Sequence, residues 1–155
     1  MSSETGTGVA GGTISGRCLC GAVTFKADVA KREVDICHCS MCRRWSAGPY
    51  IGLGHDGPIA FQGADNIGIY KSSEWAERAF CKMCGSSLYY HLLGTDHYSL
   101  SASTLDDQSG LVLTLQIFID EKPAYYDFAN DTPRLTGAEA FAAFDSSAKT
   151  ERDHG

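Results

Sequence analysis

The chain has 155 residues, of which 43% are hydrophobic and 21% charged, so it is long enough to fold as one domain around a core. Its formal net charge of -6 disfavours binding to nucleic acid, whose phosphate backbone requires clustered lysine and arginine. The first residues lack the basic and apolar segments of a signal peptide, and no stretch is apolar enough to span a membrane. We therefore expect no nucleic-acid or membrane partner and a cytoplasmic location.

Three regions are predicted along the chain. Residues 1–12 are small and polar and are expected to form a disordered leader. Residues 13–145 are expected to form a single domain, and residues 146–155 a charged, polar tail. The sequence makes no prediction of the oligomeric state.

The secondary structure of the central region is predicted to be mainly β, because short runs rich in β-branched and aromatic residues alternate with glycine or polar turns. Helical patterns are confined to residues 40–45 and 136–144. In the second of these, Thr136 is a candidate N-cap and Glu139 completes a capping box. The predicted strands lie at residues 22–25, 58–62, 67–70, 87–91, 98–102 and 112–119.

Seven cysteines are the most informative residues, because their spacing divides them into a set of four and a set of three. Four sulfurs complete the tetrahedral shell of a structural Zn²⁺, whereas three leave one coordination position open for water, a thiol or a carbonyl oxygen. The spacing therefore predicts one closed zinc site and one open zinc site at which chemistry can occur. The closed set is Cys18, Cys20, Cys81 and Cys84, and the open set is Cys37, Cys39 and Cys42.

Local geometry favours metal binding by both sets. Cysteines two residues apart on a strand or tight turn project to the same side, and Cys81-x-x-Cys84 is typical of a zinc knuckle. Gly85 follows this knuckle, where a left-handed conformation costs glycine nothing. His38 lies between two cysteines of the open set and is expected to point away from the metal, as a bystander or as a support for a ligand.

Disulfides and reactive thiols are the alternatives to metal binding. The odd number of cysteines, their short spacings and the lack of a secretion signal fit a reducing compartment better than disulfides. Two further hypotheses stay open at this point. One is a zinc-stabilised binding module without catalysis, and the other is a redox or metal-handling protein that uses the open set as reactive thiols.

Three motifs surround the cysteines: GRCLCGAVTF at residues 16–25, CHCSMCRR at 37–44 and RAFCKMCGS at 78–86. Two weaker motifs follow at residues 103–107 and 117–122. In these motifs, and across about residues 16–127, the chain resembles the glutathione-dependent formaldehyde-activating enzyme family, which shares its domain with centromere protein V. The resemblance implies an Mss4-like fold of twisted antiparallel β-sheets with structural zinc and few short helices.

The resemblance also implies an activity and its site. The closed zinc matches Cys18, Cys20, Cys81 and Cys84, and the open, catalytic zinc matches Cys37, Cys39 and Cys42. The implied enzyme is a carbon–sulfur lyase of the S-(hydroxymethyl)glutathione synthase type, with a role in aldehyde detoxification. Its partners would be a small-molecule thiol, such as glutathione, and formaldehyde or another small aldehyde. A thiol at the open position is expected to lose its proton near neutral pH and to attack the aldehyde, giving a hemithioacetal, or to reverse that reaction.

Residues near the open site are candidates for substrate contacts. Arg43 and Arg44 follow its last cysteine and are predicted to bind a substrate carboxylate through a guanidinium fork. The chain departs from many relatives of the family, which carry histidine at the position of Gln116 and tryptophan near Tyr125 or Tyr126. These departures leave the identity of the thiol and the aldehyde open. His55, His91 and His97 are weaker candidates for a distant fourth ligand or a base. Asp106 and Asp107 are candidates for a proton relay or for the support of an arginine, and equally for a turn.

Overall fold

The computed structural model describes residues 10–144, and the chain divides into two compact units that alternate along the sequence. The first unit contains the closed cysteine set and the second contains the open set. Because each unit is built from two separate stretches, the prediction of a single domain over residues 13–145 stays a prediction. The stretches are Met1–Val34 and Ile51–Val112 for the first unit, and Asp35–Tyr50 and Leu113–Gly155 for the second.

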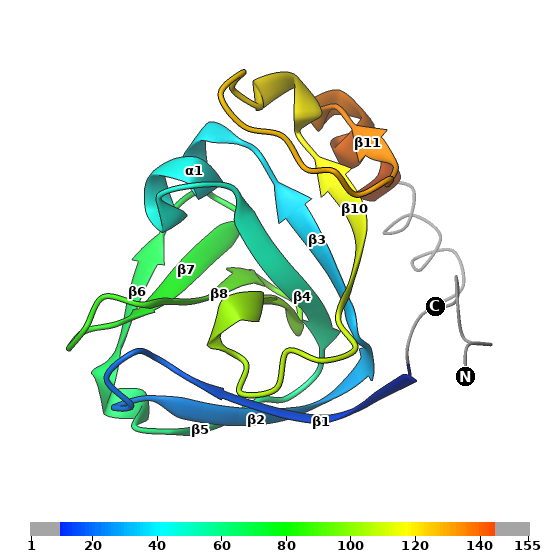
Figure 1. The fold of residues 1–155 in the computed structure, drawn as a ribbon. Helices are drawn as coiled ribbons and strands as arrows, with labels where there is room; N and C mark the ends of the chain where they lie inside the picture. The colour runs from blue at the N-terminus through cyan, green and yellow to red at the C-terminus, as the bar shows by residue number, and fades with distance from the viewer. Residues whose placement is uncertain (1–9, 145–155) are drawn as a thin grey trace. The chain divides into compact units, whose positions relative to one another are not determined.

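A three-stranded antiparallel sheet forms one layer of the first unit (Figure 1). Its strands, in spatial order, are β1 (Ala10–Arg17), β2 (Thr24–Lys31) and β5 (Ala60–Gln62). In β2, buried and exposed positions alternate, because successive side chains of a strand point to opposite faces. Phe25, Ala27 and Val29 are thereby directed into the core.

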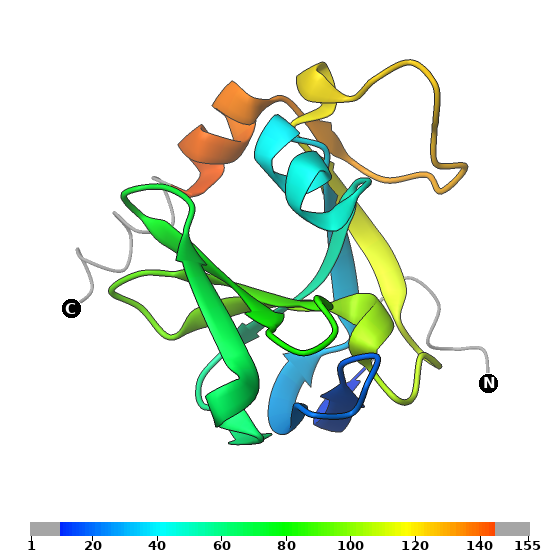
Figure 2. The same cartoon turned by 90° about the vertical axis from the view of Figure 1, so that its left-hand side faces the viewer.

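A second antiparallel array in this unit is made largely of consecutive hairpins, drawn in green in Figure 2. Its outermost strand, β6, is the edge, and β7 and β8 pair with a register shift between Ala79 and Phe80. In spatial order the strands are β4 (Tyr50–Asp56), β9 (His97–Ser101), β8 (Ser87–Leu92), β7 (Ala76–Cys81) and β6 (Ile67–Lys71).

The core of the first unit lies between these two sheets. A series of aromatic rings crosses it, from Phe25 to Phe61 at 6.0 Å, on to Tyr89 at 5.6 Å, and on to Tyr98 at 5.2 Å between centroids. Fully burying one large apolar side chain contributes about 1.5–3 kcal/mol relative to leaving it exposed. The leucines that complete this core, each at most 1% exposed, are Leu53, Leu88 and Leu100.

Position 16 of β1 requires glycine, because the ring of its cross-strand partner, Phe25, leaves no space there for a side chain. A Cβ atom at this position would lie 2.5 Å from the Phe25 ring and 2.7 Å from the backbone oxygen of Thr104. We expect Gly16→Ala to lower the free energy of unfolding by about 1–3 kcal/mol, as overpacking does elsewhere. Urea unfolding of the purified protein measures this change.

The matched control is Gly54→Ala in β4, where a Cβ atom would meet only a His97 carbon at 3.8 Å, an ordinary contact. We expect this variant to be as stable as the parent chain or more stable, because alanine loses less backbone entropy than glycine in a strand. Equal unfolding midpoints for the two variants would contradict the packing argument.

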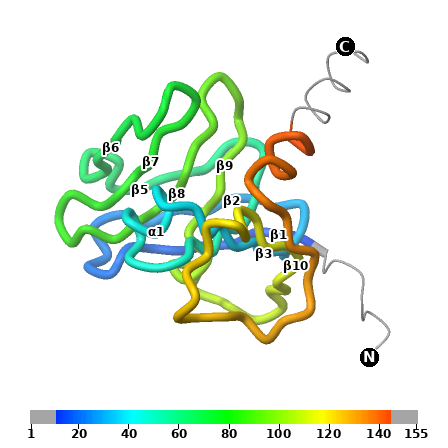
Figure 3. The backbone as a smooth tube through the Cα atoms, turned by 90° about the horizontal axis from the view of Figure 1, so that it is seen from above, coloured from blue at the N-terminus to red at the C-terminus, as the bar shows by residue number. Residues whose placement is uncertain are grey.

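The second unit contains the neighbouring strands β3, β10 and β11 and the short helix α1. Strand β11 pairs with β10 in parallel, the one parallel pair among the strand pairings described here. Figure 3 shows the long yellow-to-orange connection that leaves β10 and ends in a helical segment at residues 137–144. The bounds are β3 (Glu33–Cys37), α1 (Ser40–Ser46), β10 (Val112–Ile117) and β11 (Arg134–Leu135).

Between residues 10 and 144, three single turns of 3₁₀ helix connect the strands, and the predicted capping box begins the last helical segment. The N–H of Thr136 donates to Glu139 Oε1 at 2.8 Å, and the N–H of Glu139 donates to Thr136 Oγ1 at 3.1 Å. This reciprocal pair confirms the predicted helix start. The 3₁₀ turns are η2 (Ala64–Asn66), η3 (Ala102–Thr104) and η4 (Ile119–Glu121).

The mainly β fold of largely antiparallel sheets with few short helices is confirmed. One boundary needs correction, because Ala10–Gly12, which were expected to belong to a disordered leader, form the start of β1. Gly12 and Ala10 pair with Val29 and Lys31 of β2, a contact that the polar sequence of this segment does not reveal. The rest of the leader and the tail at 146–155 lie outside the described residues. Within residues 10–144, no helix has both the length and the apolar character needed to cross a membrane.

Candidate metal centres

The four cysteines of the closed set meet in the first unit, where all their sulfur atoms lie within 4.8 Å of one another. The Sγ atoms of Cys18 and Cys20 are 3.7 Å apart, and those of Cys20 and Cys81 are 3.9 Å apart. A disulfide would require about 2.05 Å. Tetrahedral zinc with Zn–S bonds of about 2.3 Å places its sulfurs about 3.8 Å apart. The donor set and its spacing therefore fit a four-sulfur metal site.

Two turns of similar design carry these cysteines. In the first, the N–H of Gly21 donates to the Cys18 carbonyl at 3.2 Å, and in the second, the N–H of Gly85 donates to the Cys81 carbonyl at 2.8 Å. Both glycines are left-handed, with φ of 81° and 82° respectively. This confirms the conformation predicted for Gly85, and it shows that the shorter Cys18-x-Cys20 turn uses the same solution.

Hydrogen bonds to sulfur support negative charge in the closed set. The N–H of Val23 donates to Cys18 Sγ at 3.4 Å, and the N–H of Met83 donates to Cys81 Sγ at 3.3 Å. The hydroxyl of Ser86 lies 3.2 Å from Cys84 Sγ, and this contact, together with backbone hydrogen bonds from Ser86 and Cys20, lowers the pKa of the Cys84 thiol to about 5. Thiolates are the form in which cysteine binds metal.

The three cysteines of the open set meet in the second unit, also with their sulfurs within 4.8 Å of one another. Cys37 ends β3, Cys39 is the N-cap of α1, and Cys42 lies buried in the first turn of that helix. The Cys39 sulfur caps the helix by accepting from the Cys42 N–H at 3.3 Å. Among the described residues, no fourth histidine, cysteine or carboxylate joins this group.

The crowding of three sulfurs has an electrostatic consequence. The neighbouring thiols of Cys39 and Cys42, together with burial, raise the pKa of Cys37. Three thiolates cannot share a half-buried space without a compensating cation. The donor set therefore fits a metal ion that would be held by three protein sulfurs with one coordination position left for another ligand.

His38 is buried and does not join the three sulfurs, as expected from its place between two ligands. One ring nitrogen, Nε2, lies 2.9 Å from Gln116 Oε1, and the other, Nδ1, lies 2.8 Å from the hydroxyl of Tyr126. With Nε2 donating to the amide oxygen, Nδ1 accepts from Tyr126, and burial lowers the pKa of His38, so the ring is neutral. Both ring nitrogens have hydrogen-bond partners. His38 therefore connects the turn between Cys37 and Cys39 to Gln116 of β10 and to Tyr126 in the loop that follows, and these contacts brace the turn.

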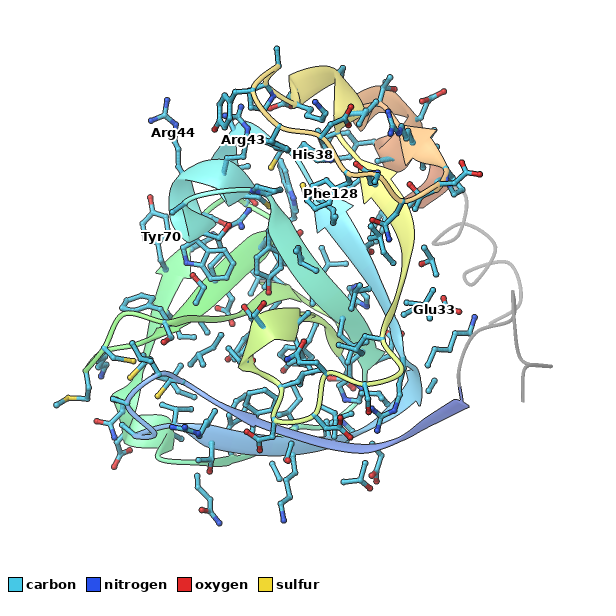
Figure 4. All side chains as sticks on the ribbon, viewed as in Figure 1. Glu33, His38, Arg43, Arg44, Tyr70 and Phe128 are labelled. Atoms are coloured by element: carbon cyan, nitrogen blue, oxygen red, sulfur yellow. The ribbon has the colours of Figure 1, made fainter. Side chains whose placement is uncertain are left out.

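Sequence reasoning missed this bracing network. Gln116 is fully buried in β10 and donates through Nε2 to Thr132 Oγ1 at 3.2 Å, so its amide connects His38 to the loop before β11. The ring of Phe128 adds a contact at 6.0 Å from His38, and Figure 4 shows these two side chains next to each other. The signal available in the sequence was the polar Gln116 within the apolar run 112–119, because a buried polar side chain requires hydrogen-bond partners.

Arg43 and Arg44, the candidates for substrate contacts, line a pocket of about 410 Å³ in the second unit, together with Tyr125. Arg43 Nε donates to the His38 carbonyl at 2.9 Å, which fixes the orientation of its guanidinium. Arg44 is exposed and extends outward from α1. Their contact with a substrate carboxylate stays a prediction.

The other candidate residues have structural partners within the first unit. His55 Nε2 lies 3.0 Å from the Pro58 carbonyl, and His97 Nδ1 lies 2.9 Å from Asp56 Oδ1. His91 lies between Glu77 and the Thr95 carbonyl. Within the described part of the chain, none of them joins either cysteine set.

The two aspartates of the 103–107 motif also have local roles. Asp106 accepts from Ser15 Oγ at 2.9 Å, and Asp107 accepts from the N–H and the hydroxyl of Ser109. The latter is the turn that was considered as the alternative to a proton relay.

The fold and the two cysteine sets define a mainly β protein with two centres that can hold a metal ion, one complete and one open. Comparison with known families agrees with this class. Residues 13–121 match the glutathione-dependent formaldehyde-activating enzyme family, and the chain belongs to it.

Two individual proteins show the extent of the similarity. An uncharacterized lyase of Schizosaccharomyces pombe is 36% identical over 122 residues, which cover 78% of this chain and 89% of that protein. The crystal structure of a Rhodobacter sphaeroides protein is similar with a TM-score of 0.53 and 23% identity, over 64% of this chain and 99% of that one. At this identity the second similarity shows the fold alone.

Proposed function

We propose that the protein is a zinc-dependent carbon–sulfur lyase of the S-(hydroxymethyl)glutathione synthase type. In this proposal it joins glutathione or a similar thiol to formaldehyde or another small aldehyde, and catalyses the reverse reaction. The observation that carries the proposal is the set of three sulfurs within 4.8 Å of one another, with no fourth ligand in the group among residues 10–144. A complete shell would have no place for substrate.

Family membership and the lyase of S. pombe support the coarser part of this proposal, a lyase-type function. The thiol, the aldehyde and the identity of the metal as zinc are the finer parts. Zinc is the metal that best suits closed and open sites built from cysteine alone. A cytoplasmic location belongs to the same proposal, because free thiols of this number are retained in reducing compartments.

The residues have distinct roles in the proposed reaction. Cys18, Cys20, Cys81 and Cys84 would hold a structural zinc, and Cys37, Cys39 and Cys42 would hold the second ion. A zinc ion in the open site would supply positive charge that favours the thiolate form of a substrate thiol. His38 is braced on both ring nitrogens and keeps the turn between Cys37 and Cys39 in one conformation.

The atoms of the reaction balance without an oxidant or reductant. The thiol loses its proton, its sulfur forms a bond to the carbonyl carbon, and the π bond of the carbonyl opens. The carbonyl oxygen takes a proton, so the product is a hemithioacetal with the composition of the thiol plus the aldehyde. The reverse direction breaks the same carbon–sulfur bond.

Exchange NMR of formaldehyde and glutathione tests the function. We expect zinc-loaded protein to accelerate interconversion of the free thiol and the hemithioacetal above the rate with thiol alone. The control is the Cys42→Ser variant, which should return the rate towards the background while the four-sulfur set stays complete. Acceleration with N-acetylcysteine but not glutathione would change the thiol and keep the reaction class. No acceleration with either thiol would contradict the proposal and favour a zinc-stabilised binding module.

A further inference from the structure

Strand β6 is an open edge of the first unit, and Figure 1 shows it at the left-hand margin of its sheet. Among the described strands it pairs with β7 alone, which leaves the backbone N–H and C=O groups of its other side without a strand partner. Proteins commonly protect such an edge with proline, with charged side chains or with a bulge. The sequence of β6, IGIYK, has only Lys71 at its end, and its register with β7 is regular.

Hydrogen bonds at the two ends of β6 show which of its residues face β7. The N–H of Lys82 donates to the Asn66 carbonyl at 2.7 Å, and the N–H of Ser72 donates to the Ala76 carbonyl at 3.1 Å. In an antiparallel ladder, residues that bond to the neighbouring strand alternate with residues that do not. The backbone groups that point away from β7 are therefore those of residues 67, 69 and 71.

Apolar side chains flank this edge on both faces of the sheet. Ile69 is 49% exposed and Tyr70 is 64% exposed, and successive side chains of a strand point to opposite faces. Figure 4 shows the Tyr70 ring outside the ribbon of β6. Trp75, in the turn between β6 and β7, is 49% exposed as well. Unpaired backbone groups next to exposed apolar side chains are suited to pairing with another strand.

The backbone of β6 is complementary to itself. When two copies of β6 pair antiparallel about a two-fold axis at Ile69, the two Ile69 residues lie opposite each other, and Ile67 of each copy lies opposite Lys71 of the other. All three pairs consist of outward-facing residues, and each pair exchanges two N–H···O=C bonds, which gives about six bonds. Moving the axis by one residue would leave one outward-facing residue of each copy unpaired.

Gly68 leaves space for an aromatic ring in this register. Tyr70 of each copy lies opposite Gly68 of the other, on the face of the sheet that these two residues share. The Phe80 ring of β7 already leans over Gly68, where a Cβ atom would lie 2.5 Å from the ring. Tyr70 of the second copy therefore meets Phe80 across the glycine, and aromatic pairs of this kind add to the stability of a sheet.

The charges of the edge favour a second copy in the antiparallel arrangement. Asp65 precedes β6 and Lys71 ends it, so the basic end of each copy lies beside the acidic end of the other. A parallel arrangement would bring like charges together. Lys71 also pairs with Glu74 at 3.6 Å, and Lys82 Nζ donates to the Asp65 carbonyl. These four charges sum to zero although the chain carries -6, so two copies approach here without strong repulsion.

We propose that β6 docks against β6 of a second copy of this chain, which gives a two-fold symmetric dimer with one sheet continuous through both copies. A two-fold pairing uses the edge of each copy once, so association at this edge ends at the dimer. A pairing of five residues a side is smaller than the interface of about 1,200–2,000 Å² that a stable complex buries. We therefore expect a reversible dimer with a Kd on the order of 10 μM.

Sedimentation equilibrium of the full chain, at concentrations about tenfold below and above this Kd, measures the association. We expect the mass to rise from one chain to two. Ile69→Lys places two lysines directly opposite each other on the axis and should raise Kd about 10-fold or more. The matched control is Val112→Lys, because Val112 is 43% exposed in β10, a strand with neighbours on both sides. It should dimerise like the parent chain, and circular dichroism checks that both variants are folded.

A charge exchange tests the antiparallel register without changing an apolar residue. Lys71→Glu places an acidic side chain beside Asp65 of the second copy and should raise Kd about 5-fold. The double variant Asp65→Lys with Lys71→Glu should restore the dimer, because opposite charges again meet at both ends of the pairing. A double variant that dimerises more weakly than Lys71→Glu would contradict this register.

Hydrogen exchange of the unmodified chain gives a readout for single residues. The amides of Ile69 and Lys71 should exchange quickly well below Kd and slowly well above it, because only the second copy provides their acceptors. The amides of Gly68 and Tyr70 bond to β7 and should be equally protected at both concentrations.

Three results would overturn the inference. One is a chain that stays monomeric at the highest concentration. Another is a dimer that Ile69→Lys leaves unchanged, since such a dimer would use a different surface. The third is growth beyond two chains with rising concentration, which would indicate open association instead of a closed two-fold pairing.

Discussion

Replacing Cys84 by serine is expected to abolish cooperative folding of the zinc-loaded protein. Cys84 belongs to the four-sulfur set that joins the turn after β1 to the turn after β7. A structural zinc site contributes about 10–16 kcal/mol of apparent binding free energy in small zinc-dependent peptides, as much as the entire stability of a typical domain. The serine hydroxyl is a poor zinc ligand and leaves the shell incomplete. Urea unfolding followed by circular dichroism, with zinc content measured by mass spectrometry, checks this result.

The matched control is Cys84→His, which keeps a zinc-binding side chain at the same position. We expect this variant to retain part of the zinc and to unfold between the parent chain and the serine variant. Parent-like unfolding of Cys84→Ser, with two zinc ions still bound, would show that the four-sulfur set is not a structural site. Such a result would also contradict the inference of a metal site from the distances between the four sulfurs.

Cys42→Ser is expected to leave the fold intact and to remove the acceleration of hemithioacetal exchange. Cys42 lies on the short helix α1 and belongs to the incomplete set, so the fold depends on it less. Losing one of only three ligands should reduce activity by about 100-fold or more, since loss of a partner that merely supports a ligand costs 10–100-fold. Exchange NMR measures the rate, and zinc content should fall from two ions per chain to one.

Met41→Ser is the control for this variant, because Met41 is the preceding residue of α1 and is 42% exposed. It introduces the same serine into the same helix and should keep both the rate and the zinc. Equal destabilisation by Cys42→Ser and Cys84→Ser would contradict the division of the cysteines into four and three. Full activity of Cys42→Ser would move the reaction away from the open set.

Predictions based on short spacings agree with the structure because neighbouring residues have few conformations available. The knuckle before Gly85 and the capping box of Thr136 and Glu139 are both formed as expected. The helix at 40–45 and the strand at 67–70 appear within one residue of the predicted bounds. In each case the hydrogen bonds or the side-chain pattern that define the element lie within a few residues of chain.

Elements with weak local signals were not predicted. Strands β1, β3, β4, β7 and β11 were all missed. β1 and β4 contain several glycines, which disfavour strands locally, and β1 owes its conformation to seven pairs with β2. The pocket lined by Arg43 and Tyr125 was not predicted either, because these two residues are brought together only by the path of the chain after β10.

The sequence by itself determined which cysteines form each metal set, the turns that present them and the mainly β character of the fold. These follow from stereochemistry over two to eight residues and from the number of sulfurs that zinc requires. The tertiary structure alone decided that Gln116 and Tyr126 brace His38, and that Arg43 and Arg44 share a pocket with Tyr125. Such contacts join residues about 80 positions apart, and their formation depends on the packing of whole elements rather than on local preference.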